Sequence, residues 1–302
     1  MTTATTTTTE PDRLVPARLP PGRYSLVDLA RSEWTKLRSV RSTLWSFVIV
    51  VVLGVGVGVL ATAETRAHWA TSGHGGFQPI RTSLIGIDIA QLVIGVLGVL
   101  VMTGEYGTGT IRATFSAAPR RPLVLVAKTG VFAVVAVVIS EVVAFLSFFL
   151  GQAMLTAPAT HATLSTPGAL RAVVGSGLYI CVIGLLGLGL GVVVRHTAGA
   201  IGALVGVLLI LPIVVSALPS SIVNAVQRYE PLQIGKMMIT VPTDTGVRAI
   251  LRGPHGVVRH VVLHGGGGGT FTFSPWVGFG ILCGYVVVLL VVGGVLLVRR
   301  DA

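Results

Sequence analysis

Two carboxylic acids, Asp88 and Glu141, lie inside apolar stretches of this 302-residue chain that are long enough to cross a membrane. A carboxylate at the bilayer centre costs roughly 2.5–3.5 kcal/mol on insertion scales, so Glu141, near the middle of its stretch, is not expected to face lipid. Asp88 lies in the outer part of its stretch. Gln91 follows Asp88 after one helical turn and adds an amide to the same segment. These side chains either form hydrogen bonds between helices or contact a polar or cationic substrate or a proton. The sequence leaves both interpretations open.

Other reactive residue types form no catalytic, metal-binding or nucleotide-binding pattern. Cys181 and Cys283 both fall inside apolar stretches and are interpreted as small packing residues. Six of the histidines lie in predicted loops without the spacing of a zinc site. The motifs H-E-x-x-H, G-x-S-x-G and G-x-x-x-x-G-K-[ST] are absent from the sequence. The Gly265–Gly269 tract has no following lysine and is interpreted as a flexible hinge. We therefore predict no enzyme, no metal site and no cofactor in this chain.

The elements that must position these residues are long apolar helices. Apolar residues make up 52% of the chain, charged residues 11%, and the mean hydropathy is +0.86. The runs lack both the polar face of a soluble helix and the alternation of a barrel strand. They cover residues 44–62, 82–103, 123–151, 172–194, 199–218 and 275–298. The sequence predicts an all-α, polytopic membrane protein with six transmembrane helices, preceded by an amphipathic interfacial helix.

The charges predict how the chain is oriented. Of the 22 lysines and arginines, 14 flank the spans on the side that would hold both termini. The positive-inside rule then makes both termini cytoplasmic and places the protein in the cell membrane. We expect a disordered cytoplasmic tail at 1–24, a connecting helix at 25–43, and a transmembrane domain at 44–302. Its outer loop, 219–274, also carries basic residues, but long loops translocate largely regardless of charge. The net charge of +11 suits anionic headgroups rather than nucleic acid.

The segment from Ser25 to Ser42 predicts an amphipathic helix in the membrane interface. Its apolar residues recur at helical spacing and include Trp34, while basic side chains occupy the other face. Glu33 intrudes on the apolar arc and needs a cationic partner, either Lys36 or a residue of a neighbouring helix or subunit. The helix is either an inert anchor or a lever that joins the membrane domain to a cytoplasmic partner.

The loop predicted after the second span, from Gly104 to Arg121, is the other polar segment of interest. Thr108 or Thr110 can cap a short helix that ends before Pro119. The segment is either a simple connector or a rigid knob on the cytoplasmic face.

Three segments resemble ABC-2 type transporter permeases, the membrane subunits of bacterial ATP-binding cassette exporters. They are the stretch SEWTKLRS at 32–39, the pattern E-Y-x-x-G-T-I-R-x-T…P-R-R at 105–121, and the ending from Ser274 to Ala302. The resemblance implies a connecting helix at 25–42, a coupling helix within 108–117 and partial re-entry of the outer loop. The chain departs from the family pattern at Arg248–His264 and at the glycine tract.

The resemblance also implies partners and roles. Two copies of a separate ATPase, carrying ATP-Mg, would dock on the cytoplasmic face, and a second permease subunit, as a homodimer, would complete the path for a small solute. The residues implied in ATPase coupling are Glu33, Glu105, Thr110, Ile111, Arg112 and Phe115. The candidate translocation path is Asp88, Gln91 and Glu141. The alternatives are an ion-coupled secondary transporter that uses Asp88 and Glu141, an intramembrane enzyme, and a membrane sensor or complex anchor.

Overall fold

A computed structural model describes residues 25–39, 41–69, 77–111, 121–155, 161–241, 247–252, 258–263 and 274–300. Six helices are long and apolar enough to cross a membrane, which confirms the predicted fold class. They are α2 (Arg41–Ala67), α4 (Ile87–Thr108), α6 (Arg121–Met154), α7 (Ala169–Val194), a fifth made of three pieces, and α12 (Pro275–Arg300). The fifth consists of α8 (Thr197–Val205), the π turn η1 (Gly206–Ile210) and α9 (Leu211–Ser216).

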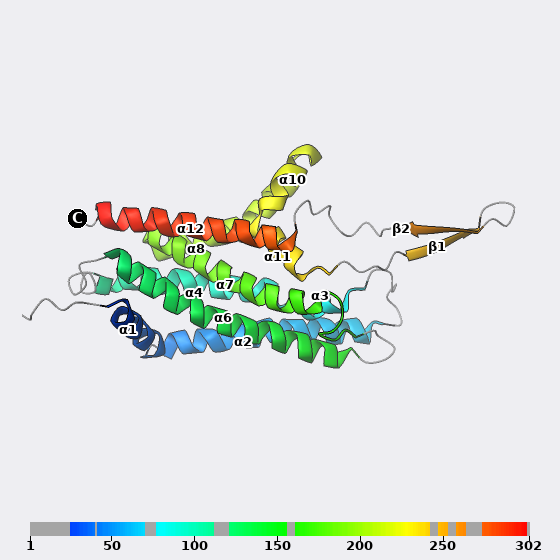
Figure 1. The fold of residues 1–302 in the computed structure, drawn as a ribbon, viewed down its shortest axis with the longest axis horizontal. Helices are drawn as coiled ribbons and strands as arrows, with labels where there is room; N and C mark the ends of the chain where they lie inside the picture. Colours follow the sequence, from blue (N-terminus) through cyan, green and yellow to red (C-terminus); the bar gives the residue numbers. More distant parts are fainter. Residues whose placement is uncertain are drawn as a thin grey trace, which may run out of the picture.

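Shorter elements flank this bundle. They are α1 (Leu26–Ser39), α3 (Pro79–Ser83), α10 (Ser220–Val226), the 3₁₀ turn η2 (Gln227–Tyr229), α11 (Pro231–Ile239) and the strands β1 (Val247–Arg252) and β2 (Val258–Leu263). The bundle is elongated, with α1 and the end of α12 at one extremity and the two strands beyond the other (Figure 1). We call these extremities the α1 end and the hairpin end.

Helix α7 lies at the centre of the bundle, packed by α4, α6, α11 and α12. It approaches α4 most closely, because glycines face each other across the contact. A Cβ atom on Gly98 would overlap the carbonyl oxygen of Gly184, and one on Gly187 would overlap that of Gly95. Small residues allow such close approach between membrane helices, where van der Waals packing replaces the hydrophobic driving force.

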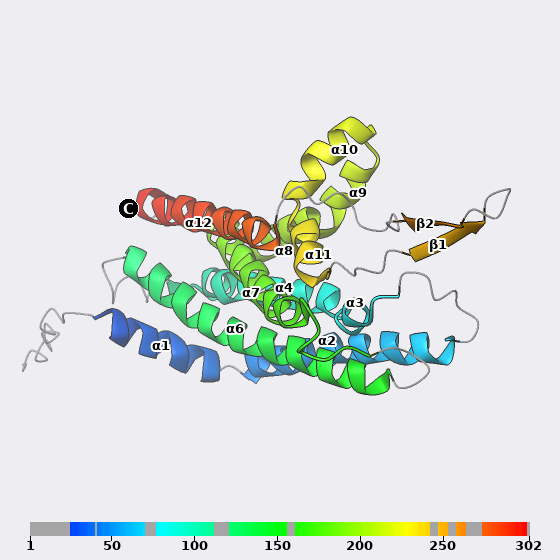
Figure 2. The same ribbon diagram turned by 45° about the vertical axis from the view of Figure 1, so that its right-hand side comes forward.

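The fifth span bends away from the bundle. Pro212 lacks the amide that would donate to the carbonyl of Leu208, and the chain forms a π turn just before it. Beyond this turn, α9 and α10 stand apart from the other helices (Figure 2). The side chains of Ile213 and Val214 on α9 are therefore exposed, at 65% and 54%.

The long loop after the fifth span turns back into the bundle. Tyr285 of α12 donates its hydroxyl to the carbonyl oxygen of Tyr229, at 3.1 Å. Tyr285 lies about 15 Å along α12 from its start at Pro275, at a rise of 1.5 Å per residue. Helix α11 then packs against α7 and α12 with most of its side chains buried. The chain thus re-enters the bundle as far as Tyr229.

Two features of the fold differ from the sequence prediction. The strands β1 and β2, which were not predicted, pair antiparallel from Val247 opposite Leu263 to Arg252 opposite Val258. The loop predicted from Gly104 begins later, because α4 continues to Thr108 and ends at Gly109 in the left-handed conformation, with φ of 72°. Glu105 therefore lies on the spanning helix rather than in the loop.

Candidate functional site

Four charged side chains form a closed ring at the α1 end. Lys36 Nζ lies 2.7 Å from Glu33 Oε1 and 3.0 Å from Glu105 Oε1. Lys128 Nζ lies 2.5 Å from Glu33 Oε2 and 2.8 Å from Glu105 Oε1. Each carboxylate thus binds both ammonium groups, and the four formal charges cancel. We call these four residues the charge ring.

The charge ring joins three helices. Glu33 and Lys36 come from one face of α1, since they are three residues apart and so neighbours on a helix. Glu105 comes from the last turn of α4, and Lys128 from the third turn of α6. Any displacement of α1 must therefore move α4 and α6 or break ion pairs.

Most of the ring is withdrawn from solvent. The side chains of Lys128 and Glu33 are only 4% and 5% exposed, and that of Glu105 is 14% exposed. Lys36 closes the ring on its open side, at 42%. Removing one partner of a buried ion pair typically costs about 3–5 kcal/mol, because the remaining charge stays buried without compensation. The ring is thus rigid while intact and expensive to open.

The pKa of Lys36 reflects two opposing effects, burial of its ammonium group and attraction to the two carboxylates of the ring. Burial by itself lowers the pKa of this ammonium group, since it disfavours the charged form. The hydrogen bond to Glu33 and the charge of Glu105 act in the opposite direction and outweigh burial. The pKa of Lys36 is raised above its ordinary 10.5, so the group stays charged at physiological pH.

The end of α4 is also held from its other side. The guanidinium of Arg195 lies 5.5 Å from the ring centre of Tyr106, next to Glu105. Arg195 ends α7 with a left-handed φ of 60°, a conformation that turns the chain sharply into α8. The last turn of α4 is thus fixed between the charge ring and the α7–α8 turn.

The predicted coupling residues divide into three groups: two in the charge ring, two just after α4, and two outside the described residues. Glu33 and Glu105 meet in the charge ring. Thr110 is exposed and its hydroxyl lies 2.9 Å from that of Thr108, whereas Ile111 is buried, at 7% exposed, against Met102 and other apolar side chains. Ile111 therefore packs inside the bundle, and its side chain is not part of the exposed surface.

Arg112 and Phe115, with most of the predicted 108–117 helix, lie outside the described residues. The sequence analysis gave Lys128 no role beyond its charge. The available signal was a lone lysine among apolar residues after the start of a span, which requires an acidic partner.

Gln91, one of the predicted path residues, links three helices near the hairpin end. Its amide nitrogen donates to the backbone oxygen of Asp88 at 3.2 Å, and its amide oxygen accepts the hydroxyl of Tyr179 on α7. The Tyr179 ring in turn fills the space over Gly235 of α11. Asp88 itself is exposed, and the charges nearest to it are those of Lys236 and Arg81. Gln91 is therefore a packing residue, while the Asp88 side chain is exposed within reach of two cationic charges.

Glu141, on α6, does not lie beside Gln91 and Tyr179. Its carboxyl group covers Gly177 of α7, where a Cβ atom would come within 2.5 Å of Glu141 Cδ. It therefore faces a neighbouring helix, although its Oε2 has no hydrogen-bond partner among the described residues. Gly177 and Tyr179 are two residues apart and thus about 200° apart around α7. Glu141 and the Gln91–Tyr179 pair lie on opposite sides of α7, so the predicted path residues do not line one path within this chain.

No group of three or more His, Cys, Asp or Glu side chains within the described ranges is placed to hold a metal ion. The fold and the site define a multi-pass membrane protein with six candidate spans among its described residues. Residues 27–302 match the family described as ABC-2 family transporter protein. Because the match covers most of the chain, the protein belongs to that family of membrane permeases, whose members generally work with an ATPase partner. No curated protein matched the chain.

Proposed function

We propose that this chain is the permease subunit of an ATP-driven ABC-2 exporter, in which the charge ring transmits movement from a separate ATPase to the spanning helices. Two ATPase subunits carry ATP-Mg, and a second copy of the permease completes the path for a small solute. The observation that carries the proposal is the ring itself. It connects an interfacial helix outside the bundle to the ends of two spans.

The docking surface comprises the exposed face of α1 and the segment within 108–117. The side chains of Arg31, Thr35 and Arg38 on α1 are exposed, on the face away from the charge ring. Thr110 is exposed at the start of the second segment, next to α4. Helix α1 and Thr110 lie at the α1 end, which the excess of basic residues predicts to be cytoplasmic. A push on either segment reaches α4 and α6 through ion pairs that are costly to break.

The ion-coupled alternative is less well supported. It requires Asp88 and Glu141 to act on one path, but α7 separates Glu141 from Gln91, the neighbour of Asp88. The exposed apolar side chains of α9 instead favour contact with lipid or a second copy.

The test separates docking from transmission. The tagged full-length chain is co-expressed with its ATPase, and co-purification and ATP hydrolysis are measured in nanodiscs with a fluorescent lipophilic solute. Phe115→Asp, in the predicted docking segment, is expected to abolish co-purification. Glu33→Gln, in the charge ring, is expected to preserve co-purification while hydrolysis no longer responds to solute.

Arg81→Gln serves as the control, because Arg81 is exposed at the hairpin end, far along the bundle from the charge ring. It is expected to behave like the unaltered chain in both measurements. If Glu33→Gln keeps full coupling, the charge ring does not transmit movement. If Phe115→Asp keeps both co-purification and the response of hydrolysis to solute, the docking surface is misplaced.

A further inference from the structure

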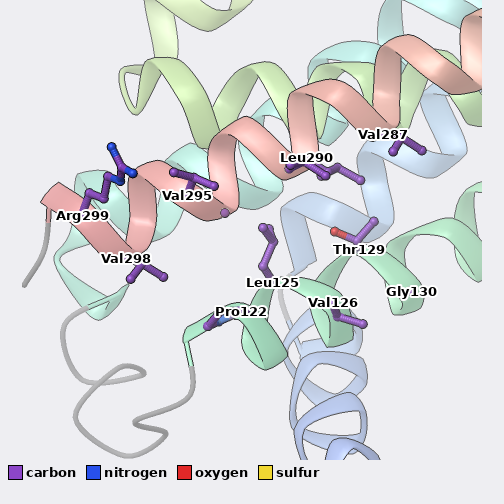
Figure 3. A pocket seen from close by; sticks show the side chains of 12 residues that line it. Pro122, Leu125, Val126, Thr129, Gly130, Val287, Leu290, Val295, Val298 and Arg299 are labelled. Atoms are coloured by element: carbon purple, nitrogen blue, oxygen red, sulfur yellow. The ribbon is translucent and has the colours of Figure 1, made fainter.

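An apolar groove separates α6 from α12 at the α1 end of the bundle (Figure 3). It has a volume of about 830 Å³ and is lined by side chains that include Leu125, Val126, Leu290 and Val298. It is separate from the charge ring, whose residues do not line it. Its walls are the surfaces of two spanning helices, so its natural surroundings are lipid rather than water.

The groove has the length of one leaflet. Along α12 it runs from Val287 to Arg299, which corresponds to about 18 Å at 1.5 Å per residue. Half of a hydrocarbon core of about 30 Å is about 15 Å, and the remainder reaches the headgroups. At the mouth, Arg121 of α6 donates to the carbonyl oxygen of Leu297 at 3.1 Å and ties the two helices together.

Two glycines keep the groove open. A Cβ atom on Gly130 of α6 would meet nothing within 4 Å, and one on Gly294 of α12 would meet only Leu125 Cδ2, at 3.7 Å. The hydroxyl oxygen of Thr129, which also lines the groove, has no hydrogen-bond partner among the described residues. The helices therefore leave a furrow here that the protein's own side chains do not fill.

A cation stands at one end of this furrow. Arg299 is exposed at the last turn of α12 and lines the mouth, while the rest of the wall is almost entirely apolar (Figure 3). A guanidinium group at headgroup depth pairs well with a phosphate. A helix from a second copy would fill the apolar part, whereas an anionic lipid would fill it and also pair with Arg299.

We propose that this groove binds one anionic glycerophospholipid, with an acyl chain along Gly130 and Gly294 and the phosphate at Arg299. On the topology given above, the lipid comes from the inner leaflet. The site requires neither the ATPase nor the transported solute. It gives the permease a fixed lipid that packs between the third and sixth spans.

Native mass spectrometry of the purified full-length chain tests this proposal, with phosphatidylglycerol and phosphatidylcholine as probes. Gly130→Leu places a side chain in the groove, at a position where a Cβ atom meets nothing within 4 Å, and its phosphatidylglycerol occupancy should fall to that of non-specific lipid. Gly280→Leu is the matched control, because Gly280 is equally open but lies on the other half of α12. It should bind as the unaltered chain does.

Arg299→Gln tests the headgroup contact. It should reduce the preference for phosphatidylglycerol over phosphatidylcholine about fivefold, the effect of one arginine near an anionic surface. Arg81→Gln, which removes an exposed arginine from α3 at the hairpin end, should leave the preference unchanged.

Photocrosslinking of the unaltered chain keeps the test independent of how the variants fold. Phosphatidylglycerol with a diazirine on its acyl chain should label peptides within 122–130 and 287–299. Labelling only elsewhere would overturn the proposal. Unchanged occupancy in Gly130→Leu would do the same, and so would a change in oligomeric state with no change in bound lipid, which would assign the groove to a second copy.

Discussion

The two ends of the bundle are fastened by different chemistry. At the α1 end, the charge ring ties α1, α4 and α6 through four ion pairs. At the hairpin end, the neutral amide of Gln152 on α6 donates to the oxygen of Pro79 and the hydroxyl of Ser83, at 3.0 and 2.7 Å. Its own oxygen accepts the backbone amide of Ala162 at 2.6 Å.

The two kinds of fastening differ in how they respond to a charge brought near them. A neutral amide is held by short, directional hydrogen bonds that no change of charge disturbs, so the hairpin end acts as a fixed clamp. Ion pairs respond to any charge brought near them, and buried ones respond strongly. The α1 end is therefore suited to receive a signal, and the hairpin end to resist it.

The largest expected effect comes from removing the most buried charge of the ring. Lys128→Met leaves Glu33 and Glu105 with Lys36 alone, and should lower the free energy of unfolding by about 3–5 kcal/mol. Thermal unfolding of the purified chain measures this loss. Lys236→Met is the control, because Lys236 makes no ion pair within 4.0 Å among the described residues, and it should have a much smaller effect.

A double-mutant cycle sharpens this prediction. Glu33→Gln combined with Lys128→Met removes both members of the most buried pair, and the double variant should lose less stability than the two single variants added together. The coupling energy of such neighbours is about 0.5–3 kcal/mol. Strict additivity would show that the two residues do not share the charge ring.

Breaking the clamp at the hairpin end should have a smaller effect. Gln152→Leu removes three hydrogen bonds, each of which is worth about 0.6 kcal/mol on average in a membrane protein, so a loss of about 2 kcal/mol is expected. ATPase coupling should be retained. Phe149→Leu, on the exposed face of the same helix, controls for the change in volume. A loss of coupling in Gln152→Leu would contradict the division between a signal-receiving end and a fixed end.

The pH dependence of the charge ring separates it further from the neutral clamp. Since the pKa of Lys36 is raised in the folded protein, its contribution to stability is complete below 10.5 and is lost as pH rises through the folded-state value. The melting temperatures of the unaltered chain and Lys36→Met should therefore differ by a constant amount between pH 7 and 9.5. The difference should shrink above pH 10.5. A difference that already shrinks below pH 9 would contradict the raised pKa.

The sequence predicted the six spans because each apolar run is long enough to cross a membrane and lacks the polar face of a soluble helix. It also predicted that Glu33 requires a cationic partner, and Lys36 was one of the candidates. Lys128 was missed, because pairing between residues 95 positions apart depends on tertiary packing that local patterns do not encode. The partners of Gln152 were missed for the same reason. The bend of the fifth span had a local signal in Pro212, but the π turn that accommodates it was not predicted.

Glu230, a buried acidic residue of the re-entrant segment, provides the smallest expected effect. Its side chain is buried at the start of α11, and Oε1 has no hydrogen-bond partner among the described residues. Burial raises the pKa of this carboxyl group, and the charge of Lys236 only partly opposes that shift. The ionised form is therefore disfavoured in the folded protein, and the resulting destabilisation appears as pH rises from the ordinary value of 4.5.

Glu230→Gln keeps the shape of the side chain and removes the charge, so it should raise the melting temperature slightly at pH 7.5. Below pH 4.5 the two proteins should unfold at the same temperature, because the carboxyl group is then protonated in both the folded and the unfolded state. Glu64→Gln is the control, since Glu64 is exposed, and it should change neither value. A lower melting temperature for Glu230→Gln at pH 7.5 would mean that a cation, a solute or a second subunit stabilises the carboxylate. Glu230 would then belong with the charge ring as a group whose charge is used.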